Sequence, residues 1–421
     1  MIAGFSFVAL MLAAMPIAFV LLATTMIYVL VSGNTQILTA IPQIMFGSVE
    51  SFDLLAIPLF VLLGEIMNES GLTRRIIIAA RVWLARLPHN LVIVNLISNL
   101  ALAAIMGSAT AQMAVMSRVV VPEMEKDGYD RGYAASITAS AGLLGPIIPP
   151  SMVFIIFGVI AQVSIADMFM AGIVPGMVLF ALIMAIALFQ AGRHRTPGHT
   201  GTPLPTGSRL RATLPGVATM LIPLTIIGGI SGGVFTPTES AAVAIVVALI
   251  FGAVIFRELP MKSVPLIIDR TVTNTAIVLF LIMAAKVFGW VLTFNQIPQA
   301  VAAFIVSLTA DPTMFMLLVV AALMVVGMFL DGIAALIILT PILLPVAVSH
   351  YGIDPIQFGV VMSLTLVLGL LTPPVGTGLY IAAAMSEIPI TRLARLVLPY
   401  VAASLVVILL VVLVPWTVRP F

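Results

Sequence analysis

Long apolar runs, separated by short polar connections, fill almost the whole sequence. Several runs contain no Asp, Glu, Lys or Arg, namely residues 2–31, 168–192, 212–238, 240–256, 271–285, 287–310, 312–330 and 396–418. A helix rises about 1.5 Å per residue, so about 20 apolar residues cross the hydrocarbon core of a bilayer. The runs therefore predict about ten to thirteen membrane crossings or half-crossings.

These crossings are predicted to be helices, because lipid offers no hydrogen-bond partner to the backbone and a helix supplies its own. The runs are continuous, whereas strands of a membrane barrel alternate apolar and polar positions. The first segment lacks a basic start and is long, so we expect a retained span rather than a cleaved signal. The predicted fold class is an all-α polytopic membrane protein.

Composition agrees with this prediction. Hydrophobic residues make up 62% of the chain and charged residues 8%, whereas soluble proteins carry about 25% charged residues. A lipid bilayer is therefore the expected surrounding. The net charge is +2 and the chain has no cysteine, which argues against a nucleic-acid partner and excludes disulfides and thiolate metal sites.

The most polar stretch covers residues 190–211, and no acidic residue lies between Asp167 and Glu239. Cytoplasmic loops carry an excess of basic residues, so residues 191–212 are predicted to form a cytoplasmic linker. The basic residues in this stretch are Arg193, Arg195, Arg209 and Arg211.

The linker divides the chain into two predicted halves, residues 1–190 and 213–421, that resemble each other. Gly and Pro mark special backbone geometry, so their coincidence indicates a structural repeat, which is typical of secondary transporters. The residues alone leave open whether the repeats are parallel or inverted. At an offset of 224 residues the coincident pairs are Pro88 and Pro312, Gly128 and Gly352, Asp130 and Asp354, Gly145 and Gly369, Pro149 and Pro373, Pro150 and Pro374, and Pro175 and Pro399.

Two Pro- and Gly-rich stretches, residues 142–151 and 369–378, interrupt long apolar segments. Proline unwinds a helix, so we predict broken helices over about 132–160 and 356–385. Backbone groups left without partners in the membrane cost several kcal/mol unless they line a cavity or bind an ion. The alternative is a kink repaired by neighbouring Ser or Thr side chains.

A small or polar patch precedes each break and lies between two short apolar arms. Arms of about a dozen residues are too short to span, so we predict re-entrant hairpins over about 94–121 and 314–348. The first patch offers the hydroxyl groups of Ser108 and Thr110, and the second offers the carboxylate of Asp331.

Asp331 is the strongest candidate for a metal ligand. A carboxylate at membrane depth is costly and by default marks an ion or proton path. Hard cations prefer oxygen ligands, so Asp331 with the oxygens around Gly369 and Thr372 is predicted to hold sodium. The alternative is a residue that only caps a helix at the hairpin tip.

Two further charged residues lie beside apolar segments. Lys286 is expected either to reach an interface or to pair with a carboxylate, and a structural role is favoured. Glu239 follows Thr236 and Pro237, which is typical of a capped helix start.

Four motifs give the sequence a specific resemblance. Together and in this order, across nearly the whole chain, they resemble the large membrane subunit of tripartite ATP-independent periplasmic (TRAP) transporters, in the ion-transporter superfamily. The resemblance implies two inverted repeats, each with a hairpin and a broken helix, and an elevator-type transport domain beside a scaffold. The motifs are Pro-Glu-Met…Gly-Tyr-Asp (122–130), Gly-Pro-Ile-Ile-Pro-Pro-Ser (145–151), Phe-Thr-Pro-Thr-Glu-Ser-Ala-Ala-Val-Ala (235–244) and Thr-Pro-Pro-Val-Gly (372–376).

The resemblance also implies a function and partners. The implied function is sodium-coupled uptake of a small organic anion, of the carboxylate or sugar-acid class, across the bacterial inner membrane. The implied partners are a periplasmic substrate-binding protein and a small membrane subunit of four helices. Sodium is the coupling ion, and no other cofactor is implied.

The family's binding residues carry over onto matching positions. A first sodium site would use Ser108, Gly145 and Ile148. A second would use Asp331, Gly369 and Thr372. Family members often have Asp or Thr where this chain has Gln112, whose amide oxygen can bind sodium but adds no charge. The implied substrate-binding residues are Gly107, Ala109, Thr110, Pro150, Gly332 and Pro374.

Three other functions were weighed. A stand-alone sodium–dicarboxylate symporter would share this architecture without needing a binding protein. A channel is disfavoured because two occluded sites suit alternating access. An intramembrane enzyme is disfavoured because the sequence has no His-Glu-x-x-His, no Gly-x-Ser-x-Gly and no cysteine.

Overall fold

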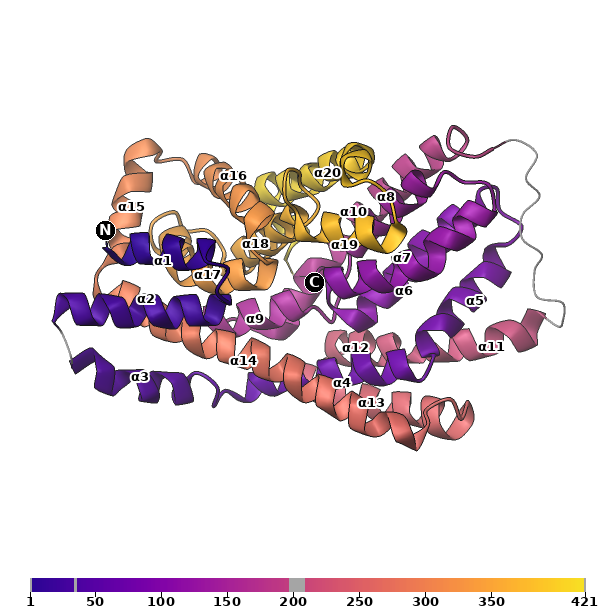
Figure 1. The fold of residues 1–421 in the computed structure, drawn as a ribbon, viewed down its shortest axis with the longest axis horizontal. Helices are drawn as coiled ribbons and strands as arrows, with labels where there is room; N and C mark the ends of the chain where they lie inside the picture. Colours follow the sequence, from indigo (N-terminus) through magenta and orange to yellow (C-terminus); the bar gives the residue numbers. More distant parts are fainter. Residues whose placement is uncertain (1, 34–35, 197–208, 420–421) are drawn as a thin grey trace.

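The computed structural model describes residues 2–33, 36–196 and 209–419. Most of the predicted linker, residues 197–208, lies outside these ranges. Within them the chain is helical apart from turns and one isolated β-bridge (Figure 1). Seven helices are long and apolar enough to cross a membrane, or up to eight when one bent pair counts as a single span. The all-α, polytopic fold class is therefore confirmed.

The first half contains ten α-helices and one short 3₁₀ helix among the described residues. They are α1 (Ile2–Leu12), α2 (Ile17–Ser32), α3 (Gln36–Gly47), η1 (Phe52–Leu55), α4 (Ala56–Glu69), α5 (Leu72–Leu84), α6 (Asn90–Met106), α7 (Ala109–Lys126), α8 (Arg131–Gly142), α9 (Met152–Ala161) and α10 (Ile165–Ala191).

The second half begins with α11, inside the predicted linker. Its elements are α11 (Arg209–Thr219), α12 (Leu221–Ser231), α13 (Pro237–Leu249), η2 (Ile250–Ile255), η3 (Met261–Ser263), α14 (Val264–Phe294), α15 (Ile297–Leu308), α16 (Pro312–Phe329), α17 (Gly332–Ser349), α18 (Pro355–Gly369), α19 (Thr377–Ser386), α20 (Ile390–Leu413) and η4 (Pro415–Thr417).

Helix boundaries in the two halves follow the offset of 224 residues seen in the sequence. Adding 224 to the bounds of α6 (90–106) and α7 (109–126) gives 314–330 and 333–350, which match α16 and α17 within two residues. The same shift carries α8 onto α18, α9 onto α19 and α10 onto α20, within three residues. Each half therefore contains a hairpin, then a helix, a break and a second helix.

Local sequence explains where these helices begin. Asp130 accepts a hydrogen bond from the Tyr133 amide (2.9 Å) at the start of α8. Its counterpart Asp354 accepts one from the Ile356 amide (2.7 Å) at the start of α18. Carboxylates at this position satisfy amides that the helix leaves free. The predicted capped start of α13 is also confirmed, because Thr236 and Glu239 form a reciprocal capping box.

The two halves interlock around a shared hydrophobic core. Figure 1 shows the α6–α7 hairpin to the right of the centre and the α16–α17 hairpin to the left. The second arm of each hairpin packs on the post-break helix of the other half, α7 on α19 and α17 on α9. Helices α9 and α18 approach closely, because a methyl group added to Gly359 would lie 2.2 Å from the Phe157 ring.

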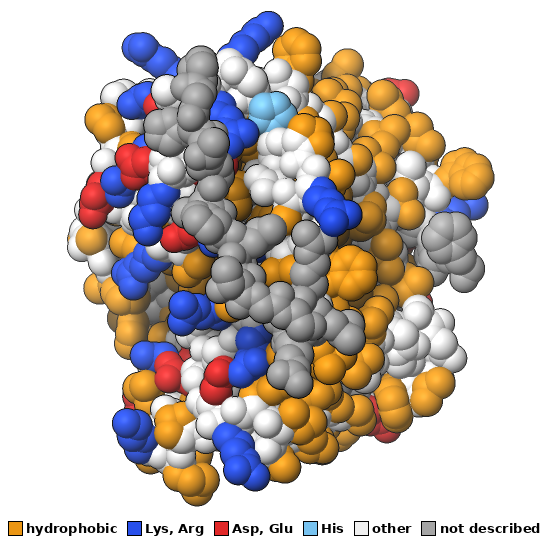
Figure 2. All heavy atoms as spheres, turned by 90° about the vertical axis from the view of Figure 1, so that its right-hand side faces the viewer, with side chains coloured by type: hydrophobic (Ala, Val, Ile, Leu, Met, Phe, Trp, Pro, Cys, Tyr) orange, Lys and Arg blue, Asp and Glu red, His pale blue; other side chains and the backbone are white. Residues whose placement is uncertain are grey.

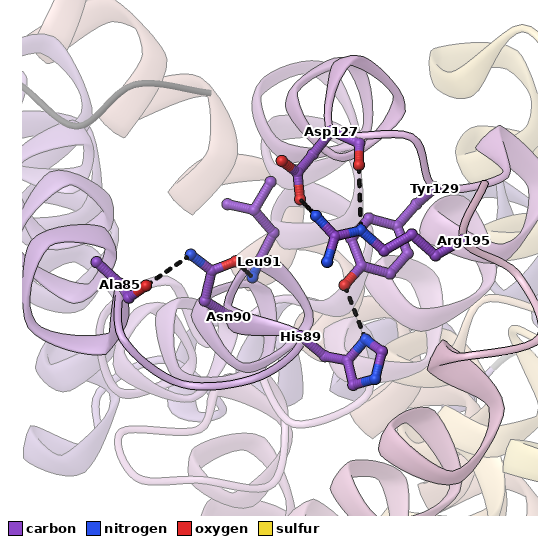
Figure 3. A network of polar contacts seen from close by, with 7 residues as sticks. All are labelled: Ala85, His89, Asn90, Leu91, Asp127, Tyr129 and Arg195. Carbon is purple, nitrogen blue, oxygen red and sulfur yellow. Dashed lines mark hydrogen bonds and ion pairs between the residues drawn. The ribbon is translucent and has the colours of Figure 1, made fainter. Parts of the chain in front are cut away.

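A polar network ties the end of α10 to the base of the first hairpin (Figure 3). The Asp130 amide donates to the His194 carbonyl (2.8 Å), and the Thr196 amide donates to the Gly128 carbonyl (2.9 Å). Arg195 forms an ion pair with the buried carboxylate of Asp127 (3.1 Å). This end of the molecule faces the viewer in Figure 2, where most Lys and Arg side chains lie on the left with Asp and Glu among them, and hydrophobic side chains cover much of the right.

Tyr129 lies at the centre of this network, between α7 and α8. Its hydroxyl is 3.1 Å from Nδ1 of His89, and Arg195 lies over its ring. Burial raises the pKa of the Tyr129 hydroxyl, so the phenol stays protonated and uncharged at neutral pH.

Candidate functional site

The tip of the first hairpin packs directly on the first break. Gly107 ends α6 with φ +59°, and an added methyl group would lie 2.9 Å from the Pro150 carbonyl oxygen. A methyl group on Gly145 would lie 3.2 Å from the Ser108 carbonyl and 2.8 Å from Oε1 of Gln112. A larger residue at either position would clash, so glycine allows the backbone of the hairpin tip to lie directly against the backbone of the break.

Gln112 points its amide oxygen into this contact. Its Nε2 donates to Oδ1 (2.9 Å) and to the carbonyl (2.8 Å) of Asn99, which assigns the other end of the amide as oxygen. The side chain is fully buried, and Oε1 has no hydrogen-bond partner among the described residues. A buried acceptor without a partner is rare and costs free energy unless something binds it.

A buried polar chain fixes this orientation, and sequence reasoning missed it. Nδ2 of Asn95 donates to Oγ1 of Thr138 (2.8 Å). Nδ2 of Asn99 in turn donates to Oδ1 of Asn95 (2.7 Å). A pair of Asn residues spaced by four in an apolar helix was the available signal, because such residues share one helix face.

The remaining predicted residues of the first half lie around the tip and the break. Ser108 caps α7, accepting from the Ala111 amide (3.5 Å), and its hydroxyl lies 3.3 Å from that of Thr110. Ala109 and Ile148 are buried. The Pro149–Pro150 peptide bond is cis, and the buried Ser151 hydroxyl bonds the Pro146 carbonyl across the break (2.5 Å).

The second hairpin meets the second break in the same manner. A methyl group on Gly369 would lie 2.5 Å from the Gly327 carbonyl carbon. Beyond the break, the Gly376 amide donates to the Met328 carbonyl (3.1 Å). A methyl group on Gly332 would meet the Leu366 carbonyl oxygen at 3.7 Å. The Pro373–Pro374 peptide bond is cis, like its counterpart.

Asp331 lies exposed at the second tip and caps α17. Its Oδ1 accepts from the amides of Ile333 (3.0 Å) and Ala334 (3.4 Å), so the capping role weighed as the alternative is present. No hydrogen bond or ion pair is found for its other carboxylate oxygen within the described ranges. One oxygen thus holds the helix start while the second is free to bind a cation.

Thr372 and Pro374 complete the second set of predicted residues. The Thr372 hydroxyl donates to the Leu368 carbonyl (2.9 Å) and is buried, which leaves its lone pairs available as acceptors. Pro374 is exposed. The described contacts bring Gly369 onto the hairpin but include no hydrogen bond between Asp331 and Thr372.

Met113 connects the two regions, and no sequence signal distinguishes it from other apolar residues. Methyl groups added to Gly142 and Gly378 would lie 2.4 Å from its Cγ and 3.0 Å from its Sδ. Its side chain therefore lies between the first broken helix and the second. In the described parts of the chain, no three His, Asp or Glu side chains cluster as a metal site, so any cation here would bind largely to neutral oxygens.

Helical hairpins that dock on broken, apolar helices are typical of membrane transporters. The fold is also that of a solved transporter. Structural comparison finds the YdaH transporter of Alcanivorax borkumensis, with a TM-score of 0.69, 16% sequence identity and coverage of 92% of this chain and 90% of that one.

The family follows from sequence. The family model for the tripartite ATP-independent periplasmic transporter, DctM component, matches residues 5–417. The chain belongs to this family. It is accordingly a multi-pass protein of the bacterial inner membrane and a transport protein rather than an enzyme.

Curated relatives are similar over most of their length. The sialic acid TRAP transporter large permease SiaM of Vibrio cholerae is 34% identical, over 98% of this chain and 95% of its own. The 2,3-diketo-L-gulonate large permease YiaN of Escherichia coli is 35% identical, over 95% and 93%. The C4-dicarboxylate large permease DctM of Pseudomonas aeruginosa is 34% identical, over 88% and 86%.

Proposed function

We propose that this chain couples sodium entry to the uptake of a small organic anion. The observation that carries the proposal is the docking of each hairpin tip on a break at equivalent positions in the two halves. Each site offers an oxygen without a partner among the described residues, Oε1 of Gln112 at the first and one carboxylate oxygen of Asp331 at the second. This arrangement suits a transporter that binds its coupling ion and solute together. The class of solute is supported by the relatives, whose names specify sialic acid, diketogulonate and C4-dicarboxylates.

The first sodium ion binds between Ser108, Gly145 and Ile148, with the amide oxygen of Gln112 as a further ligand. Support comes from Oε1 of Gln112, which has no hydrogen-bond partner among the described residues. This oxygen lies 2.8 Å from the place that a methyl group added to Gly145 would take. The ligand set is neutral, which suits a monovalent hard cation.

The second sodium ion binds at Asp331, Gly369 and Thr372. The free carboxylate oxygen of Asp331 supplies the only charge of this set, and Thr372 supplies a hydroxyl acceptor. The substrate lies between the two tips. Its proposed neighbours are Gly107, Ala109, Thr110, Pro150, Gly332 and Pro374.

Transport proceeds by an elevator movement. The two hairpins and broken helices move together as a transport domain, because they interlock through α7 with α19 and α17 with α9. The remaining helices form the scaffold, and the two halves are inverted copies. The proposed domain division is the one expected from the sequence, 1–190 and 213–421 around a cytoplasmic linker.

The proposed system has two further proteins, a periplasmic binding protein and a small four-helix membrane subunit, as the tripartite family description supports. A stand-alone symporter is the competing function. Uptake assays in proteoliposomes distinguish the tripartite system from a stand-alone symporter. Uptake should require all three proteins and a sodium gradient, and uptake by this chain alone would overturn the tripartite proposal.

Substitution of Asp331 tests the sodium site directly. Asn caps a helix about as well as Asp, so Asp331→Asn should keep the start of α17 while removing the charge. We expect sodium-driven uptake to fall at least tenfold at unchanged protein level. Asp311→Asn, at the exposed cap of α16, serves as the matched control. Wild-type sodium dependence in Asp331→Asn would remove this residue from the site.

A further inference from the structure

Lys286 is the only charged residue between Arg270 and Asp311. It lies in α14, eight residues before the helix ends at Phe294, or about 12 Å along the axis. Its neighbours Ala285 and Val287 are buried, and its own side chain is partly buried. It is thus a cation inside a candidate membrane span.

No carboxylate among the described residues pairs with Lys286. The contrast with Arg270 on the same helix is clear, because Arg270 contacts both Glu65 (3.5 Å) and Glu69 (2.8 Å). An ammonium at membrane depth is costly, and such a group either reaches an interface or pairs with an anion. The pairing with a carboxylate weighed from the sequence is absent from this structure.

The position of Lys286 relative to the second hairpin indicates what that partner is. A methyl group on Gly289 would lie 3.4 Å from Cβ and Cγ of Pro341, so α14 packs on α17 at this level. Lys286 precedes Gly289 by three residues and lies on the adjoining part of the same helix face.

The tip of the second hairpin, at Gly332, lies a fixed distance along α17 from the contact between Gly289 and Pro341. Gly332 begins α17 nine residues before Pro341, which is about 13 Å along the helix. A displacement of the hairpin by this length along α14 would bring the tip, and a solute bound there, to the level of Gly289, within about one helical turn of Lys286.

We propose that Lys286 is a solute-binding residue on the scaffold, which contacts a carboxylate of the transported anion when the hairpin tip reaches its level. The inference rests on the proposed function, since it requires an anionic solute and a moving hairpin. Lysine suits this role because its ammonium is a point charge on a flexible stem. It can follow the solute over part of the movement and then release it, whereas a bidentate arginine would hold one geometry.

Cross-linking tests the geometry without transport. The chain has no native cysteine, so paired cysteines report only on the chosen positions. Gly289→Cys with Pro341→Cys should cross-link as the structure predicts. Gly289→Cys with Gly332→Cys should cross-link only in a displaced state, in a fraction that changes when sodium is added.

Uptake kinetics test whether the positive charge of Lys286 contributes to solute binding. Lys286→Met keeps the length and apolar stem, and Lys286→Arg keeps the charge. Succinate, N-acetylneuraminate and 2,3-diketo-L-gulonate serve as probes with the complete system. For a probe that the wild type carries, Lys286→Met should raise KM about tenfold, with half-saturation by sodium unchanged and with partial recovery in Lys286→Arg. Lys262→Met, at an exposed position before α14, should match the wild type.

The outcomes are distinguishable. If the Gly289–Gly332 pair cross-links and Lys286→Met takes up every probe as the wild type does, the role of Lys286 is wrong while the elevator movement stands. If that pair never cross-links, both the movement and this inference fall. A change in sodium half-saturation alone would assign Lys286 to an ion site and overturn the proposed solute contact.

Discussion

Two buried threonines, Thr365 and Thr372, differ in their position relative to the second break. Several buried hydroxyl groups among the described residues donate to a carbonyl four residues earlier, as Thr365 does to Val361 (2.7 Å) and Thr372 to Leu368 (2.9 Å). Thr365 and Thr372 thus make the same local hydrogen bond, to a carbonyl four residues earlier. Only Thr372 lies at the break, beyond the end of α18 at Gly369, where the second sodium site is proposed.

This pair gives a matched test of the second sodium site. Thr372→Ala should raise the sodium concentration for half-maximal uptake about tenfold, because a cation loses one ligand oxygen. Thr365→Ala removes the same hydroxyl from the middle of α18 and should leave that concentration unchanged. The measurement is initial uptake rate against sodium concentration. Equal shifts in both variants would point to helix distortion rather than loss of a ligand.

Residues differ in how far the sequence alone could place them. Asp331 stands out because a charge in an apolar run is conspicuous, and its position at a hairpin tip followed from the flanking arms. The orientation of the Gln112 amide in α7 could not be predicted, since it depends on Asn95 and Asn99 of α6 and on Thr138 of α8. Met113 could not be chosen at all, because its contacts lie in both halves.

At the scale of elements, the close approach of α16 to the end of α18 is a demanding contact because it joins two backbones. Gly369→Ala would place a methyl group 2.5 Å from the Gly327 backbone, and backbone atoms cannot move aside as a side chain can. We expect a loss of about 1–3 kcal/mol in stability, as for other overpacked interiors, and loss of uptake. Thermal unfolding in detergent and uptake assays measure the two effects.

Gly228→Ala is the control for this prediction. Gly228 lies inside α12, and nothing is within 4 Å of the added methyl group. Replacement of a helical glycine by alanine at an open position should stabilise slightly, by up to about 1 kcal/mol. Equal destabilisation by the two variants would contradict the assigned contact.

The network at the base of the first hairpin makes a second prediction about elements. Asp127 is 2% exposed and pairs with Arg195, so Asp127→Asn should lower stability by about 3 kcal/mol, because a charge loses its partner in a largely dry site. The side chain of Glu387 is 77% exposed in its pair with Arg131, and Glu387→Gln should cost less than about 1 kcal/mol. Melting temperatures of the purified variants should differ in this order.

Helix positions were more predictable than helix contacts. Helix ends in the two halves recur at the offset of Gly and Pro seen in the sequence, because these residues restrict the backbone directly. The packing of α7 on α19 and of α17 on α9 joins parts of the chain more than 150 residues apart. No local pattern encodes such pairings.

At the scale of the whole molecule, the orientation in the membrane can be tested with single cysteines. Thr202→Cys, in the predicted cytoplasmic linker, should react with a membrane-impermeant thiol reagent only in inverted vesicles. Ala310→Cys, in the exposed turn between α15 and α16, should react only from the periplasmic side in intact cells. Labelling of both from one side would contradict the proposed topology.

The contacts of Met113 have a consequence for how the two breaks are packed. One thioether touches Gly142, beside the first break, and Gly378, beside the second. A methionine side chain is flexible and polarisable, so it adapts to movement on either side. Met113 is therefore a packing contact that both breaks share, and a change at either break meets the same flexible side chain.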